Sequence, residues 1–448
     1  HILSCSHGFV PAFCIGSCIA WSSGAIHLLS METFPLTLLD MTTRHVSWII
    51  SGFCLGATLS ALLVYKIWRF PLVRSILSLA KICESEFFSF IDSQDLIAVL
   101  LARILAGISV GCLHFLVPIY IQDIASSDLK ITLDYIWSTF LAAGILAENV
   151  LINILSGVPP AVLFVGFFFM PESPRYLCYK GQSNAAKDIL RKFREIGDDV
   201  DQDIHSWCNK KTENFAFKNV IRGPSSFRRT LPAVGLVVFD QLCGVVGCFF
   251  YLSWNFRILD GELSPDLSSI LIAAVFFVSI WLPKILGITF GDKLTLIWTL
   301  LLQFATLLLL GFYVHYRGSY NEIEEYNYLP LICYGIYVFL YGMGLHRVSW
   351  KYIRHLVPRS RYFVTMNICT ALSWFVLIFF TRGYARFIEY VGIGWLFWFM
   401  ALSCLGLVIF TAIAVPNLEK LDSKYWKFCI GTNFMSSYSY QTIFKSLK

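Results

Sequence analysis

Apolar segments about as long as a bilayer is thick recur along the whole chain, and short polar stretches separate them. An α-helix needs roughly 20 consecutive apolar residues to cross the hydrocarbon core of a membrane. Ten segments meet this requirement and predict membrane-spanning helices. They are residues 9–30, 45–66, 97–121, 133–156, 231–254, 267–288, 293–316, 328–350, 361–381 and 391–415.

Two further segments are weaker candidates for spans. Residues 71–91 are apolar but include Lys81, Glu84 and Glu86, whose charges are costly in a bilayer unless they face protein or water. Residues 158–170 are too short to cross a membrane without their neighbours. With both counted, the pattern predicts twelve spans, six on either side of a polar segment.

The polar segment between the two sets of spans is basic. Twelve Lys and Arg lie from Arg175 to Arg229, and such an excess marks loops that stay in the cytoplasm. The other loops alternate in charge in the matching way, so both termini are expected in the cytoplasm. The predicted organisation is an N-terminal six-helix bundle (1–170), cytoplasmic linker helices (171–230), a C-terminal six-helix bundle (231–416) and a cytoplasmic tail (417–448).

The composition agrees with a membrane protein and excludes several other classes. Of 448 residues, 57% are hydrophobic and 14% charged, with a mean hydropathy of +0.65, whereas a soluble domain has about 25% charged residues. The net charge of +6 is modest and spread over short loops, so no nucleic-acid partner is expected. The 14 cysteines form no Cys-x-x-Cys pair, which argues against a disulfide framework and a zinc site. No metal or other cofactor is predicted.

The fourth span contains charges and small residues at a regular spacing. Arg103 is followed by Gly107 and Gly111, and small residues four apart allow helices to pack closely in lipid. Asp123 and Lys130 follow toward the predicted inner end of the span. Charges at such depths normally find partners, so they either hold helices together or take part in gating.

A second motif, PESPRYL, follows the sixth span. Its prolines stop the helix, and Glu172 and Arg175 can exchange partners with charges at the inner ends of other spans. Residues 185–196 then predict an amphipathic helix with basic residues on its solvated face.

With these motifs the chain resembles the sugar porter family of the major facilitator superfamily, most closely its branch of insect facilitated trehalose transporters. The matching patterns are R-x3-G-x3-G…P-x-Y-x2-[DE]-[IV]-A, PESPRYL and the A-x2-[IL]-L-R run of the linker. The resemblance implies an all-α membrane protein with the major facilitator fold, twelve transmembrane helices in two six-helix halves around a central site. It also implies facilitated transport of a sugar, trehalose or a hexose, by alternating access in the plasma membrane, with no catalysis.

The resemblance also implies which residues bind the substrate, although several positions depart from the family pattern. The Q-Q-L-S-G-I-N signature of the seventh span falls on residues 240–246, where Asp240 replaces the leading glutamine and Gln241 keeps the second. A sugar offers hydroxyl groups, so amides, hydroxyls and indole faces suit its site. The implied substrate-binding residues are Gln241, Trp350, Tyr251, Ser138, Ser373 and Asp240.

The gating motifs of the family are incomplete in this chain. Only Arg69 remains of the Gly-Arg-[Arg/Lys] pattern after the second span, and Gly-Arg-Arg after the eighth span appears as Gly291-Asp292-Lys293. The charges expected to act in gating, or to hold helices together at the inner surface, are Arg103, Asp123, Lys130, Glu172, Arg175 and Arg69.

Two carboxylates, Asp240 and Glu148, fall within predicted spans, where an ionisable group indicates function. If either faces a cavity, it can bind protons during transport. Proton-coupled members of the family use a carboxylate in the first span, however, where this chain has Trp21-Ser22-Ser23-Gly24. Uncoupled, facilitated transport is therefore the favoured hypothesis.

Other functions fit the sequence less well. A seven-helix chemoreceptor would not have twelve spans, and a membrane enzyme would need a reacting constellation, whereas the histidines lack a convincing Ser, Cys or paired carboxylate. The serious alternative is a protein of the same fold that has lost transport and binds a sugar as a sensor, as the incomplete motifs suggest. The joint presence of the inner-surface charges favours a carrier. The oligomeric state is not indicated.

Overall fold

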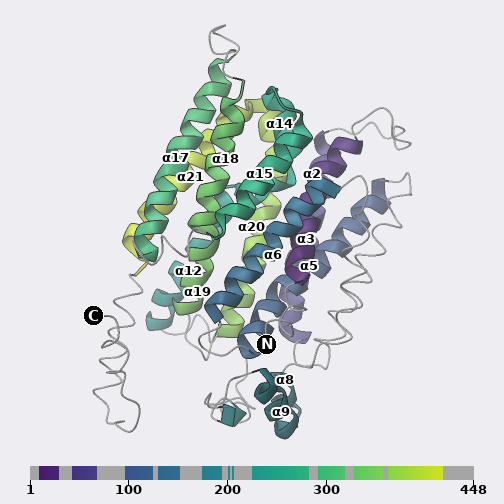
Figure 1. Ribbon diagram of the computed structural model, residues 1–448, viewed down its shortest axis with the longest axis vertical. Coiled ribbons are helices and arrows are strands. Elements are labelled where there is room, and N and C mark those ends of the chain that lie inside the picture. The colour runs from purple at the N-terminus through teal and green to yellow at the C-terminus, as the bar shows by residue number, and fades with distance from the viewer. Residues whose placement is uncertain are drawn as a thin grey trace.

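The computed structural model contains helices and turns, and no strand, in the part of the chain that it describes (Figure 1). That part comprises residues 10–29, 43–67, 96–124, 130–151, 174–193, 200–201, 204–205, 224–281, 291–317, 327–356 and 362–416. The N-terminal group of helices is α2 (Val10–Leu29), α3 (Thr43–Ile67), α5 (Leu96–Ile124) and α6 (Lys130–Leu151). Two short linker helices follow, α8 (Pro174–Tyr179) and α9 (Ser183–Phe193). The C-terminal group is α12 (Pro224–Leu242), α13 (Val245–Phe250), α14 (Leu252–Leu259), α15 (Pro265–Ser279), α17 (Asp292–Tyr316), α18 (Leu329–Met343), α19 (Leu345–Leu356), α20 (Tyr362–Val391) and α21 (Ile393–Ala414).

The hydrophobic pattern located these helices well. Each of the ten clear predicted spans coincides with described helix, and seven helical segments are long and apolar enough to cross a membrane. The two weaker candidates, residues 71–91 and 158–170, lie outside the described part of the chain.

One predicted boundary is wrong. The eleventh span was predicted to end at residue 381, but α20 continues to Val391. Arg382, Arg386 and Glu389 interrupt the apolar pattern there, yet charged side chains do not prevent a helix from extending beyond the hydrocarbon layer. The helix ends where Gly392 adopts a φ of 101°, a conformation that glycine reaches without strain.

Two of the predicted spans are interrupted helices. The seventh span is divided into α12, α13 and α14, and its first break lies at Gly244, which has a φ of 88°. The tenth span is divided into α18 and α19 at Gly344. A β-carbon at Gly344 would overlap the side chain of Thr299 on α17, so the break also allows a close approach of helices. The α12 helix starts at Pro224, before residue 231, where the C-terminal bundle was predicted to begin.

Glycines hold the N-terminal group together. A β-carbon on Gly107 of α5 would overlap the carbonyl oxygen of Phe53 on α3, and one on Gly56 of α3 would overlap the carbonyl oxygen of Ile104. The pair α2 and α6 makes the same kind of contact, with Gly144 against the carbonyl of Phe13. The backbones are therefore in contact, which is the packing that the Gly107 and Gly111 spacing predicts.

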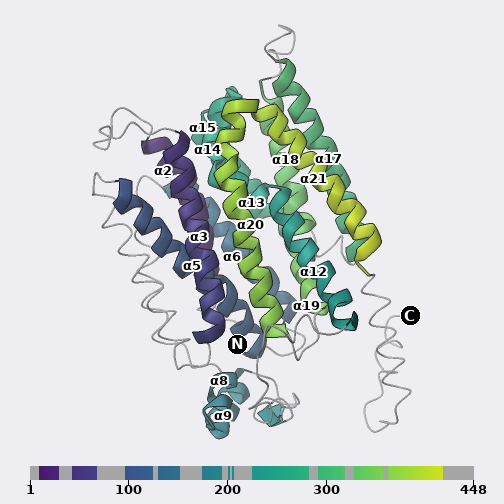
Figure 2. The ribbon, with the colours of Figure 1, turned by 180° about the vertical axis from the view of Figure 1, so that it is seen from behind.

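The two groups of helices meet along two lines. α3 packs against α20 over most of its length and α6 packs against α15 (Figures 1 and 2). In the first contact, Asn367 Nδ2 donates to the carbonyl of Ala61 at 2.6 Å. Arg382 donates to the hydroxyl of Ser47 and lies over the ring of Trp48, 3.7 Å from its centroid.

The linker helices α8 and α9 form a small unit at one end of the molecule, below the two groups in Figure 1. This end is called the linker end, and the opposite end, where α14 begins to turn into α15, the distal end. The unit has its own apolar core of Leu177, Cys178, Ala186, Leu190 and Ile204. The α9 helix covers most of the amphipathic helix predicted over residues 185–196.

Candidate functional site

A cavity with an empty volume of about 640 Å³ lies between the two groups of helices. Both groups contribute to its wall, which makes it the natural place to look for a ligand. Its lining is Ile15 and Ile19 of α2, His114 of α5, Leu141 and Ile145 of α6, Asp240 and Gln241 of α12, Val246 and Phe249 of α13, Phe276 of α15, Tyr341 of α18, His346 and Trp350 of α19, and Ser373, Trp374 and Leu377 of α20.

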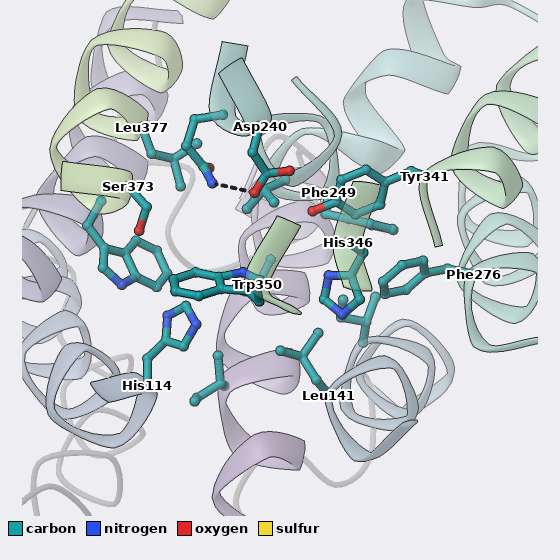
Figure 3. A pocket seen from close by; sticks show the side chains of 16 residues that line it. His114, Leu141, Asp240, Phe249, Phe276, Tyr341, His346, Trp350, Ser373 and Leu377 are labelled. Atoms are coloured by element: carbon teal, nitrogen blue, oxygen red, sulfur yellow. Dashed lines mark hydrogen bonds between the residues drawn. The ribbon is translucent and has the colours of Figure 1, made fainter. Parts of the chain in front are cut away.

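The polar part of the wall lies where α12 ends. Asp240 and Gln241 precede the Gly244 break, and both are buried, with exposed fractions of 4% and 6%. Gln241 Nε2 donates to Asp240 Oδ2 at 3.1 Å (Figure 3). Asp240 Oδ1 has no hydrogen-bond partner among the described residues. The break after α12 thus brings an amide and a carboxylate to the cavity surface.

The aromatic part of the wall combines three helices. The ring of His114 contacts two indoles, with centroids 5.7 Å from Trp350 and 5.8 Å from Trp374, and Figure 3 shows His114 next to Trp350. Trp374 also contacts Phe53 of α3 edge-on at 5.8 Å. These flat apolar faces can stack on a ring-shaped ligand.

A second aromatic cluster lies across the cavity. The ring of His346 contacts Phe276 at 5.5 Å and Tyr341 at 5.6 Å. Figure 3 shows Tyr341 next to Asp240 and His346 below them. The break at Gly344 therefore positions His346 and, one turn later, Trp350 on the same side of α19.

Four of the six predicted substrate-binding residues line this one cavity: Asp240, Gln241, Trp350 and Ser373. Ser373 Oγ donates to the carbonyl of Thr370 at 2.8 Å within its own helix. A serine hydroxyl retains acceptor lone pairs when it donates, so Ser373 can still accept a hydrogen bond from a ligand.

The other two predicted residues lie elsewhere. Tyr251 is completely buried between α13 and α14, donates to the carbonyl of Thr381 at 2.8 Å and stacks on Tyr384 at 4.5 Å. Ser138 is half-buried on α6, outside the lining of the cavity. Sequence position alone did not distinguish these two from the four that share the cavity.

Arg103 is not at the inner surface, where the sequence analysis placed it. It is fully buried within the N-terminal group, toward the distal end, and donates to the carbonyl of Cys18 at 3.3 Å and to the hydroxyl of Ser22 at 2.5 Å. Its guanidinium lies over the rings of Trp21 and Phe53, at 4.8 and 4.4 Å. These contacts join α5 to α2 and α3, because each partner belongs to one of those helices.

The remaining predicted charges cannot be placed as side chains. Asp123 and Lys130 belong to the linker ends of α5 and α6, and Arg175 to α8, but the described residues do not include their side chains. Arg69 and Glu172 lie outside the described residues.

The sequence did not point to three ionisable residues of the cavity wall: His114, His346 and Tyr341. His346 precedes Trp350 by four residues, so it shares a helix face with a residue already singled out. His114 is a polar residue within a predicted span, which is itself a functional signal. Tyr341 gave no such signal, since tyrosines are frequent throughout the apolar segments.

Contacts between the two groups lie at both ends of the cavity. Toward the distal end, Ser23 Oγ of α2 donates to Ser253 Oγ of α14 at 3.0 Å, and Ser253 Oγ is 3.0 Å from Ser269 Oγ of α15. Toward the linker end, Cys112, Phe115 and Leu116 of α5 form an apolar cluster with α12 and α20. The contacts between the two groups are thus polar toward one end of the cavity and apolar toward the other.

Comparisons with known proteins agree on one family. The sequence pattern of the family described as "Sugar (and other) transporter" matches residues 11–424. The facilitated trehalose transporter Tret1 of Bombyx mori is 24% identical over 441 residues, which are 92% of this chain and 85% of that protein. The same transporter of Polypedilum vanderplanki is also 24% identical, over 435 residues, with the same two shares.

Among solved structures, this chain is similar to the partially occluded inward open conformation of the xylose transporter XylE from E. coli. The TM-score is 0.76, the identity is 17%, and the match covers 94% of this chain and 99% of that one. XylE is a member of the major facilitator superfamily. The likeness confirms the predicted fold, an all-α membrane protein of the major facilitator type.

Proposed function

The chain belongs to the family of sugar transporters, and on that premise we propose that it moves a sugar across a membrane by facilitated alternating access. Its family and its long apolar helices make it a multi-pass membrane protein. The proposed substrate class is trehalose or a hexose, because the similar insect proteins are facilitated trehalose transporters.

The observation that supports this function best is the composition of the central cavity. Gln241 can donate and accept hydrogen bonds at once, Ser373 adds a hydroxyl, and Trp350 offers a flat face to a sugar ring. The rest of the wall is mostly apolar, which suits the carbon-bound face of a sugar.

Alternating access requires that the cavity open at one end while it stays closed at the other. The contacts at the two ends are of a kind that can separate and re-form, because the hydroxyl of Ser23 makes only two hydrogen bonds to Ser253 and the described members of the linker-end cluster are apolar. Separation at the distal end would break the Ser23–Ser253 contact, and separation at the linker end would part α5 from α12 and α20.

We further propose that transport is not coupled to protons. The first predicted span, now α2, contains no Asp or Glu. Glu148 of α6 accepts a hydrogen bond from Ser17 at 2.5 Å and does not line the cavity. Uptake of a neutral sugar is therefore expected to be the same whether or not the outside solution is acidified.

The proposed location is the plasma membrane, with both termini in the cytoplasm. The support for this orientation is the basic segment between residues 171 and 230 and the position of α8 and α9 beyond the linker end of the helices (Figure 1).

The experiment that tests the function is uptake of labelled trehalose and glucose by cells that express the chain at their surface. Saturable uptake is expected, and Gln241→Ala should reduce it about tenfold, because the buried hydrogen bonds to substrate are lost. Gln182→Ala is the matched control, since Gln182 is exposed in the turn between α8 and α9. A surface-expressed chain without saturable uptake of either sugar would contradict the proposal.

A further inference from the structure

Asp240 places a carboxylate in the wall of the cavity. Binding of a neutral sugar does not require such a group. Asp240 is 4% exposed, and only Oδ2 has a hydrogen-bond partner among the described residues, the side chain of Gln241. Oδ1 remains available at the cavity wall. A buried carboxylate is costly unless a cation or further donors stabilise it.

The cavity lining supplies no permanent counter-charge. Among the described residues that line it there is neither a lysine nor an arginine, and the other ionisable side chains are His114, His346 and Tyr341. Arg103 does not belong to the lining, since its guanidinium is held by the carbonyl of Cys18 and the hydroxyl of Ser22. No lysine or arginine among the described lining residues is therefore placed to pair with Asp240, and a cationic ligand can take that position.

Two neighbours of Asp240 can donate to its carboxylate. Gln241 offers an N–H group, and the phenol of Tyr341 lies beside the carboxylate in Figure 3. These donors offset only part of the cost of burying a charge, so the carboxylate still gains from a cationic ligand.

The position of Asp240 in its helix points the same way. Asp240 lies in the last turn of α12, just before the Gly244 break. The carbonyl end of a helix repels an anion and attracts a cation. Asp240 therefore does not stabilise its own helix, and together with the carbonyl end of α12 it makes this part of the cavity attractive to a positive group.

The remaining wall is of the type that binds ammonium groups. The aromatic side chains of Phe249, Phe276, Tyr341, Trp350 and Trp374 line the cavity together with this one carboxylate. Aromatic faces attract an ammonium group through the charge distribution of their rings. An aromatic cavity with a single carboxylate and no basic residue recognises a cationic ligand better than a neutral one.

We propose that the preferred substrate is an amino sugar, a hexose that bears a primary ammonium group. This inference rests on the proposed transport function. The ammonium group binds Asp240 Oδ1, and the sugar hydroxyls bind Gln241 and Ser373. The ring stacks on the aromatic wall. Asp240 thus determines substrate specificity, which distinguishes this cavity from one with an amide at the same position.

Equilibrium binding to the purified full chain tests this directly, with glucosamine, glucose and N-acetylglucosamine as probes. Glucosamine should bind about tenfold to a hundredfold more tightly than glucose, because it pairs a buried charge. N-acetylglucosamine keeps the ring but has lost the charge, so it should bind no better than glucose. This comparison needs no variant, and equal affinity for glucosamine and glucose would overturn the inference.

Two substitutions sharpen the test. Asp240→Asn keeps the shape of the side chain, and Asp240→Gln restores the residue that the family pattern has there. Both should abolish the preference for glucosamine over glucose, since the charge that pairs with the ammonium group is removed. Asp188→Asn, an exposed carboxylate on α9, is the matched control and should keep the preference. A preference that persists in both Asp240 variants contradicts the role of Asp240.

Uptake into proteoliposomes separates this inference from the proposed function. Equal uptake of glucose and glucosamine leaves the transport function intact and overturns the amino-sugar preference. Selective binding of glucosamine without any uptake supports the inference and contradicts transport. Glucose uptake that rises on acidification and requires Asp240, without a preference for glucosamine, shows that Asp240 binds a proton, and this also overturns the inference.

Discussion

The N-terminal and C-terminal groups of helices surround the same cavity but contribute to it differently. The four N-terminal helices are continuous and touch backbone to backbone at glycines such as Gly56, Gly107 and Gly144. Their contribution to the cavity is apolar except for His114. Arg103, one of their buried charged residues, makes contacts between helices and does not line the cavity.

The C-terminal group supplies nearly all the polar groups of the cavity. Its helices are interrupted at Gly244 and Gly344, and the polar residues Asp240, Gln241 and His346 lie next to those interruptions. An interrupted helix leaves backbone groups without helical partners, which a membrane protein tolerates where they border a cavity. We therefore propose that the C-terminal group recognises the ligand and that the N-terminal group provides a rigid wall against it.

This difference separates two kinds of substitution. In the N-terminal group, changes at helix contacts should impair folding, whereas changes in the cavity wall of the C-terminal group should lower affinity and leave folding intact. Each prediction below tests one side of that comparison with a matched control.

The largest effect is expected for Gly107→Ala. A β-carbon at this position overlaps the carbonyl of Phe53 and the backbone of Ala57, so α5 and α3 must move apart. The cost should be about 3 kcal/mol or more, because backbone atoms cannot rotate away as side chains do. Thermal unfolding of the purified protein measures this loss of stability.

Gly383→Ala is the control, since nothing lies within 4 Å of a β-carbon there, and it should not destabilise the protein. Equal stability of the two variants would show that the N-terminal group is not rigid.

A smaller and more selective effect is expected for Ser373→Ala. The hydroxyl lines the cavity and its loss removes one hydrogen bond to the sugar, so affinity should fall about threefold to tenfold with an unchanged melting temperature. Ser403→Ala is the control, because Ser403 also donates to a carbonyl of its own helix, that of Phe399, but is half-buried on α21 and does not line the cavity. Equilibrium binding of the sugar to both variants measures this difference in affinity. A loss of affinity in both would mean that the effect does not arise in the cavity.

The same comparison explains which features the sequence could predict. The helices of both groups follow from the length of apolar segments, and the Gly107 and Gly111 spacing indicates tight packing, because both signals are local. Gln241 and Trp350 were found through the family resemblance. Tyr251 was expected at the same site, but its ring lies between its own helices and Tyr384.

What the sequence could not predict depends on the rotation of one helix against another. The side of α5 that carries His114 and the side of α18 that carries Tyr341 face a common cavity only after the helices are packed. The break at Gly344 likewise has no local signal, since isolated glycines also occur within unbroken helices of this chain, as Gly107 does. Arg103 was misplaced for a related reason, because its position along α5 did not show that its partners are on α2.

The smallest effect is expected outside both groups, for Asp201→Asn in the linker unit. Lys187 Nζ lies 2.5 Å from Asp201 Oδ1, and its hydrogen bond and charge lower the pKa of that exposed carboxyl. Because the pKa is lowered in the folded state, the contact stabilises above the ordinary pKa of an aspartate and is lost only as the pH falls through the lowered value. Between about pH 5 and pH 7 the carboxylate is ionised in both the folded and the unfolded state, so no pH dependence of stability arises from it there.

An exposed ion pair contributes little to stability. Asp201→Asn should therefore match Asp188→Asn in melting temperature and in sugar uptake across that pH range. If uptake by Asp201→Asn fell as far as uptake by Ser373→Ala, the linker unit would take part in the transport cycle. Transport would then not depend on the two groups of helices alone.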